Sequence, residues 1–233
     1  MQTNFKIFLL HKNFLFWSTV YVLMVTRFSY FGFTYSPVLD DNNLFGIFHL
    51  RLPHVWQDII LHYKTYMIRP VVQSLIDPMV IAPLWQNPFL VLCLITGLHL
   101  LSCIILQNIL RQVHVRFEAF AIVIFALAPF SSEGTYWIAA SSRIIIGLFV
   151  CVLSVYLLMR AIKHQNNKLL CIAMLCNLVA MGFYEQIICF NAFFTFVILF
   201  LNIKDIQKKW IVILPFVNLA IILAYYAYFV IHN

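Results

Sequence analysis

The chain has 233 residues, of which 64% are hydrophobic and only 10% are Asp, Glu, Lys or Arg, and its mean hydropathy is +0.93. A soluble domain carries about 25% charged residues, so this composition excludes a soluble globular protein and predicts an all-α, polytopic integral membrane protein. The net charge of +7 comes from 15 Lys and Arg against 8 Asp and Glu. In such a chain we interpret the basic residues as topology markers and expect no nucleic-acid partner.

The apolar runs predict seven membrane spans within one domain, 1–233. About 20 apolar residues cross a bilayer as a helix. The first run, 14–34, follows Lys6 and Lys12 and is expected to be a retained signal anchor. The later runs lie at 88–110, 117–159, 169–203 and 210–231. The runs 117–159 and 169–203 are too long for one helix each, so each is predicted to form a hairpin of two short helices.

The distribution of charge predicts the orientation of these spans. With the N-terminus inside, every cytoplasmic connection carries at least two basic residues, and the C-terminus lies outside. The inner basic residues are Lys6, Lys12, Arg111, Arg116, Arg160, Lys163, Lys168, Lys204, Lys208 and Lys209. We therefore expect a multi-pass membrane protein; its predicted location is a bacterial cytoplasmic membrane.

Residues 35–87 form the one long outer loop in this topology. Its segment 54–62 is predicted to be an amphipathic helix in the membrane interface, with His54, Asp58 and His62 on one face. This stripe could ligate a metal, but a polar, water-facing surface is the favoured interpretation, and we expect no metal or other cofactor. Basic residues of the loop could also meet anionic headgroups; they are Arg51, Lys64 and Arg69.

Four acidic residues stand where the chain is expected to turn on the outer side. Asp40 and Asp41 follow the first span and Pro37, and such a pair suits general-base chemistry, although an ordinary Asp/Asn turn is the alternative. Glu133 and Glu185 occupy the two hairpin turns. Because each half-hairpin is short, these turns are predicted to lie below the outer surface in a protein-lined cavity. The alternative is that both glutamates are exposed loop residues.

The order of these motifs resembles the GT-C superfamily of membrane glycosyltransferases, and is most similar to its protein O-mannosyltransferase branch. The resemblance covers about residues 14–190. It rests on Asp40-Asp41, on Arg69-Pro70, on the second span with His99, on the segment from Pro129 through Glu133 to Trp137, and on Tyr184-Glu185. The chain departs from the pattern where Arg143 stands one or two positions from the usual basic residue. It also ends after seven spans, which is expected of a minimal enzyme, a truncated chain or a non-catalytic descendant.

The resemblance implies transfer of a sugar from a polyprenyl-phosphate donor to a hydroxyl acceptor on a glycan, lipid or protein, at the outer face of the bilayer. It implies Asp40 or Asp41 as the general base, Arg69 and Arg143 as phosphate ligands, and His99, Glu133, Trp137 and Glu185 as substrate-positioning residues. Two alternatives stay open: a flippase or transporter of lipid-linked saccharide, and a non-catalytic assembly subunit. The identities of the sugar and the acceptor are not encoded in any motif.

Overall fold

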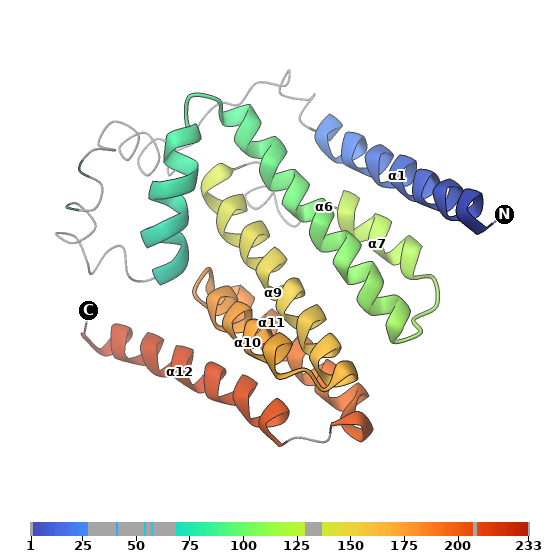
Figure 1. Cartoon of the computed structure of the whole chain (residues 1–233). Helices are drawn as coiled ribbons and strands as arrows, with labels where there is room; N and C mark the ends of the chain where they lie inside the picture. The colour runs from blue at the N-terminus through green and yellow to red at the C-terminus, as the bar shows by residue number, and fades with distance from the viewer. Residues whose placement is uncertain are drawn as a thin grey trace.

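The computed structural model describes residues 2–27, 41, 54, 57, 69–128, 137–206 and 209–232. These residues are almost entirely helical and contain no strand (Figure 1). The prediction of an all-α protein is confirmed for this part of the chain.

The described residues form a bundle of seven α-helices. Their bounds are α1 Gln2–Thr26, α6 Pro88–Gln112, α7 Glu118–Leu127, α9 Ile138–His164, α10 Asn167–Met181, α11 Glu185–Leu201 and α12 Trp210–His232. A π-helix, η4 (Val72–Ile81), and a 3₁₀ turn, η5 (Ala82–Leu84), precede α6, and a second 3₁₀ turn, η6 (Ile203–Asp205), follows α11. By length and composition α6, α9 and α12 can each cross a membrane, whereas α7, α10 and α11 are shorter apolar helices.

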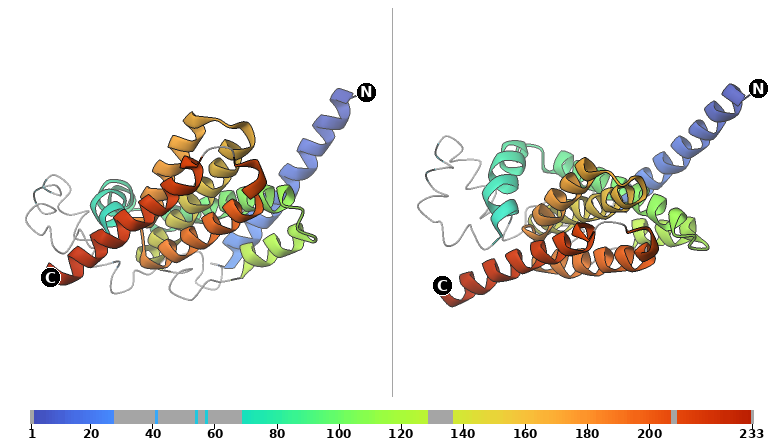
Figure 2. Two further views of the ribbon diagram at one scale, coloured as in Figure 1. Left: turned by 90° about the horizontal axis from the view of Figure 1, so that it is seen from below. Right: turned by 60° about the horizontal axis from the view of Figure 1, so that its bottom comes forward.

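Helix α9 is the centre of the bundle, because α6, α10 and α11 all pack against it. Helices α1 and α12 lie on opposite sides of this centre (Figures 1 and 2). The largest buried cluster includes Cys151, Val155 and Leu158 of α9, and Ala173 of α10 and Ile198 of α11 pack there. Small and β-branched side chains at these positions let three helices approach α9 closely.

The outer surface of the bundle is apolar. On α11 alone the exposed side chains include Phe190, Phe193, Phe196 and Phe200, and α12 exposes Phe216 and Ile221. Apolar patches of this extent make soluble proteins aggregate. They are stable against hydrocarbon, as the composition predicts for a membrane protein.

Two of the expected spans differ in the structure. Helix α1 runs from Gln2 to Thr26, earlier than the expected 14–34. The hairpin expected over 117–159 is unequal, since α7 has 10 residues and α9 has 27. The prediction of two short helices there was wrong because α9 continues past Arg160 and ends only where Gln165 takes a left-handed conformation. The second hairpin, with 15 residues in α10 and 17 in α11, has the expected short arms.

The two ends of the bundle differ in charge. At one end lie η4 and the first turns of α6, α9 and α11; we call this the loop end (Figure 1). The opposite, basic end carries the last turns of α6 and α9 and the first turns of α10 and α12. Its basic residues are Arg111, Arg160, Lys163, Lys168 and Lys209.

Candidate functional site at the loop end

The first ion pair of the loop end joins the long loop to the turn between α10 and α11. Arg69 Nε lies 3.2 Å from Glu185 Oε1, and Arg69 Nη2 donates to Glu185 Oε2 at 3.2 Å. This two-nitrogen geometry is the fork by which guanidinium recognises a carboxylate or a phosphate. The guanidinium also stacks over the Tyr184 ring at 4.4 Å, an arrangement that holds its plane in place. The pair remains accessible, since the Glu185 side chain is 47% exposed.

The backbone of Arg69 is fixed by the residue one turn later. Gln73 donates its backbone N–H to the Arg69 carbonyl at 3.0 Å, and its side-chain oxygen accepts from the Arg69 N–H at 3.1 Å. Gln73 is the second residue of the π-helical run η4, whose wider turn accommodates Pro78 in its interior. π-Helical segments are rare and occur frequently at functional sites.

The second ion pair is buried between η4 and α9. Arg143 Nη2 lies 3.8 Å from Asp77 Oδ2, and Asp77 is fully buried while Arg143 is nearly so. The Ser142 hydroxyl is close to the carboxylate but donates to the Ala139 carbonyl. Among the described residues, neither Asp77 oxygen accepts a hydrogen bond. The Asp77 carboxylate oxygens therefore lie beside the Arg143 cation and can still accept hydrogen bonds.

Burial sets the protonation of Asp77, which lies on η4, outside the membrane-spanning helices. Loss of hydration raises the pKa of this carboxyl to about 7, and the charges of Arg143 and Arg69 offset only part of that rise. A carboxyl with a pKa near neutrality can gain or lose a proton at physiological pH. That property is shared with many catalytic acids and bases.

The two ion pairs belong to one cluster. The Arg69 charge acts on Asp77 as well as on Glu185, and Arg143 completes the group from α9. Tyr226 of α12 is close enough to sense the charges of Glu185 and Arg69. Segments that lie far apart in the sequence thus bring two arginines and two carboxylates together at the loop end.

Asp41 reaches the same end of α9. Its Oδ1 accepts the backbone N–H of Ala139 at 2.8 Å, and the side chain is buried. Ala139 lies in the first turn of α9, where backbone N–H groups have no helical partner, and the residue at the helix N-cap, Trp137, supplies no side-chain cap. Asp41 therefore caps α9 from a distant part of the chain, where the helix dipole also favours its charge.

The remaining residues predicted from the sequence fall into two groups. Trp137 sits at the start of α9, two residues before the Asp41 contact. His99 is buried in α6, with its ring edge-on to Phe125 of α7 at 5.4 Å and near the Arg27 charge. Asp40, Glu133, Arg51, Lys64, Asp58 and His62 lie outside the described residues, so the predicted interfacial helix over 54–62 and its metal-capable stripe are untested.

An apolar groove opens beside the ion pairs. A cavity of about 300 Å³ lies between α6, α7, α9 and α11, and its lining includes Ala140, Tyr184 and Gln186 at the loop end. A second cavity of about 140 Å³ continues along α6, α9 and α11 as far as Val113 and Leu201 near the basic end. The two cavities share Leu106, Val152 and Phe194 as lining residues. The first of these cavities is lined by the Tyr184 ring on which Arg69 stacks, and the second is its neighbour along the same helices.

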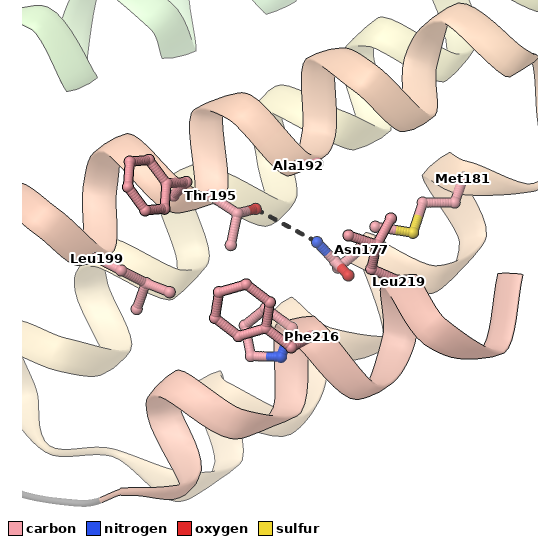
Figure 3. Close-up of a pocket in the computed structure, with 9 residues that line it drawn as sticks. Asn177, Met181, Ala192, Thr195, Leu199, Phe216 and Leu219 are labelled. Carbon is pink, nitrogen blue, oxygen red and sulfur yellow. Dashed lines mark hydrogen bonds between the residues drawn. The ribbon is translucent and has the colours of Figure 1, made fainter. Parts of the chain in front are cut away.

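A separate small cavity lies between α10, α11 and α12, and its lining includes the amide of Asn177, which donates to Thr195 Oγ1 (Figure 3). Asn177 Nδ2 donates to Asn191 Oδ1 at 3.0 Å, Asn191 Nδ2 donates to the Asn177 carbonyl at 2.9 Å, and Asn218 Nδ2 donates to Asn177 Oδ1 at 3.0 Å. Interhelical hydrogen bonds of this kind hold helices together in apolar surroundings. With a volume of about 40 Å³, this cavity has room for little more than water, and we interpret it as part of the packing.

The sequence analysis assigned no role to Asp77 or to the amides. The pattern Asp-Pro within an apolar stretch was a signal that the Asp77 carboxylate would be buried. No group of three His, Cys, Asp or Glu side chains suited to a metal occurs within the described segments. No protein-family model, curated protein or solved structure matches the chain.

Proposed function

We propose that the protein is a membrane glycosyltransferase that moves a sugar from a polyprenyl-phosphate donor to a hydroxyl acceptor at the outer face of the membrane. The observation that carries this proposal is the convergence of Arg69 and Arg143 with carboxylates at the mouth of an apolar groove. A lipid phosphate needs cationic ligands for its headgroup and an apolar path for its chain. The loop end offers both within one cluster.

The reaction proposed for this site is a displacement with inversion at the anomeric carbon. The acceptor oxygen forms a bond to that carbon while the bond from carbon to the phosphate oxygen breaks, and the polyprenyl phosphate leaves as an anion. Arg143 and Arg69 stabilise the charge on the leaving phosphate. The acceptor proton passes to a carboxylate. Asp40 and Asp41 are the bases expected from the resemblance, and Asp77, with its pKa near neutrality, is added to them.

The proposed topology has seven spans, with the N-terminus inside and the loop end outside. It is supported by the concentration of Arg111, Arg160, Lys163, Lys168 and Lys209 at the basic end of the bundle, since cytoplasmic loops are enriched in Lys and Arg. Cysteine accessibility mapping tests it. Residues 40–85, Glu133 and Glu185 should react from the outer side, and Lys163 and Lys208 from the inner side. Labelling of positions 185 and 208 from the same side would contradict the model.

The function is tested by sugar transfer in proteoliposomes supplied with radiolabelled polyprenyl-phosphate sugars. Asp40→Asn, Asp41→Asn and Asp77→Asn each remove one basic oxygen at nearly constant volume, and Asn42→Ala is the matched control with no basicity to lose. Loss of a general base lowers turnover by about 10²–10⁴-fold. We expect one aspartate variant to show that loss with its folding intact.

The alternatives give different results in the same vesicles. A flippase would move the lipid-linked sugar between leaflets without forming product, and an assembly subunit would do neither. If all three aspartate variants transferred sugar at the parental rate, the proposed catalytic role of these residues would be wrong. Absence of product from every donor tested would count against the enzyme itself.

A further inference from the structure

The segment that carries Arg69 and Asp77 touches the turn between α10 and α11 at one backbone contact. Val71 donates its N–H to the Gly182 carbonyl at 3.2 Å. Val71 lies two residues after Arg69 and six before Asp77, while Gly182 lies three before Glu185. Along the chain, Val71 therefore lies between Arg69 and Asp77, and Gly182 lies between Arg143 and Glu185.

Position 182 needs glycine because a Cβ would have no room there, and not because of its backbone conformation. Its φ is −82°, which any residue adopts. A Cβ built on it would lie 2.6 Å from Val71 Cγ2 and 3.4 Å from Val71 Cβ. The first distance is impossible without a shift, so a larger residue at 182 would force the Val71 side chain, or the loop segment that carries it, away from the turn.

The other side of the same turn is held equally closely. A Cβ on Gly147 of α9 would lie 2.9 Å from Phe183 Cβ and 3.0 Å from Ile187 Cγ1, and Phe183 is almost fully buried. Gly147 is one helical turn after Arg143. The turn 182–184 is thus wedged between the loop segment and the helix that carries Arg143.

The ion pairs alone do not explain this arrangement. Arg69 and Glu185 are partly exposed, and exposed pairs contribute little to holding two segments together. The Arg143–Asp77 separation of 3.8 Å is longer than a hydrogen bond. Close packing at Gly182 therefore helps to fix where the loop segment lies, beside the packing of Ile76 and Ile81 against α6 and α9.

We propose that Gly182 is a positioning residue that, through Val71, docks the loop segment so that Arg69 and Asp77 meet Glu185 and Arg143. The docking itself does not depend on the proposed function; only its consequence for sugar transfer does.

The contact can be trapped directly. The Cβ distance of 3.4 Å is close to the 3.5–4.5 Å typical of disulfides. In oxidised membranes, Val71→Cys/Gly182→Cys should form a cross-link that mass spectrometry assigns to positions 71 and 182. The control pair Val71→Cys/Asn202→Cys should not, because Asn202 lies at the far end of α11. Equal yields for the two pairs, or no link between 71 and 182, would overturn the docking.

The positioning role is tested by a clash and its relief. Gly182→Ala should displace the loop segment and expose Asp77, so that labelling of Asp77 by a water-soluble carbodiimide rises several-fold relative to the accessible Glu185. Val71→Ala/Gly182→Ala removes Val71 Cγ2 and should restore the parental labelling, and Val71→Ala alone should leave it unchanged. Parental labelling in Gly182→Ala, or no rescue in the double variant, would refute the proposal.

Sugar transfer adds an independent readout. It should fall at least tenfold in Gly182→Ala and recover in the double variant, which lacks the Val71 Cγ2 methyl group that the new Cβ would meet. If no variant and no parent transfers sugar, the proposed function fails, while the cross-link and the labelling still decide the docking.

Discussion

The buried carboxyl of Asp77 should make the stability of this protein depend on pH in an unusual direction. Its pKa is about 7 in the folded chain, against 3.8 for an exposed aspartate. Between these two values the folded state binds more protons at this group than the unfolded state does. The contribution of Asp77 to the free energy of unfolding is therefore largest at acid pH, falls as pH rises through the window from about 4 to 7, and levels off above it.

The size of the effect follows from the difference between the two pKa values. That difference corresponds to about 4 kcal/mol across the whole window, at about 1.4 kcal/mol per pH unit. Only part of the window is accessible, and between pH 5 and pH 8 the expected loss is about 2–3 kcal/mol. For a chain of this size, each kcal/mol of lost stability lowers the melting temperature by roughly 2–4 °C.

Asp77→Asn removes the titration while keeping the shape of the side chain. The melting temperature of parent and variant, followed by tryptophan fluorescence in nanodiscs from pH 5 to pH 8, isolates Asp77 from every other titrating group. We expect the parent to lose stability relative to Asp77→Asn as pH rises. Glu185→Gln, which changes an accessible carboxylate, should follow the parental curve. Parallel curves for parent and Asp77→Asn would refute the assignment of a neutral-range pKa to this residue.

Three further outcomes concern the other polar contacts. Asn191→Leu, which removes hydrogen-bond partners of Asn177, should lower the free energy of unfolding by about 1–3 kcal/mol. The control is Asn202→Leu, because the Asn202 amide donates to Ile198 one turn earlier on α11. Equal melting temperatures of the two variants would contradict the network. Asp41→Ala should lower the free energy of unfolding by about 1–2 kcal/mol, because it removes the cap of α9. Asp41→Asn should lower it less, since the amide oxygen still accepts the Ala139 N–H. Equal losses of stability in the two variants would count against capping. Arg69→Gln should lower the free energy of unfolding by under about 1 kcal/mol, because the Arg69–Glu185 pair is accessible to water. Sugar transfer should fall more than tenfold in the same variant. A large loss of stability would indicate that the pair has a structural role.

The resemblance singled out Arg69 and Arg143, and Glu185 was also singled out by its place at a hairpin turn within an apolar run. In a segment expected to lie in or near hydrocarbon, each ionisable side chain needs a partner. The positions of the apolar runs then placed Glu185 and the start of α9 at the same end of the bundle. What the sequence did not specify was the pairing: Glu185 meets Arg69 of the loop, whereas Arg143 meets Asp77.

The role of Asp77 was missed for a geometric reason. Period-3.6 patterning assigns a residue to a helix face, but η4 is a π-helix with Pro78 inside it, and its faces follow a different period. The amides of α10, α11 and α12 were missed because single polar residues in an apolar run do not reveal their partners. Asn177, Asn191 and Asn218 become a network only once three helices are packed together.

The fold gives Asp41, one member of the predicted aspartate pair, a structural contact. Asp40 and Asp41 were predicted on equal terms, yet one oxygen of Asp41 is committed to the Ala139 N–H, and this contact joins the start of the long loop to the first turn of α9. Arg143 lies one turn further along the same helix, so the cap also fixes the base of the helix that presents this guanidinium. A residue with that structural task can be essential to activity without taking a proton. Asp41→Asn keeps the cap and removes the basicity, whereas Asp41→Ala removes both, and comparing transfer by the two variants separates a capping role from a catalytic one.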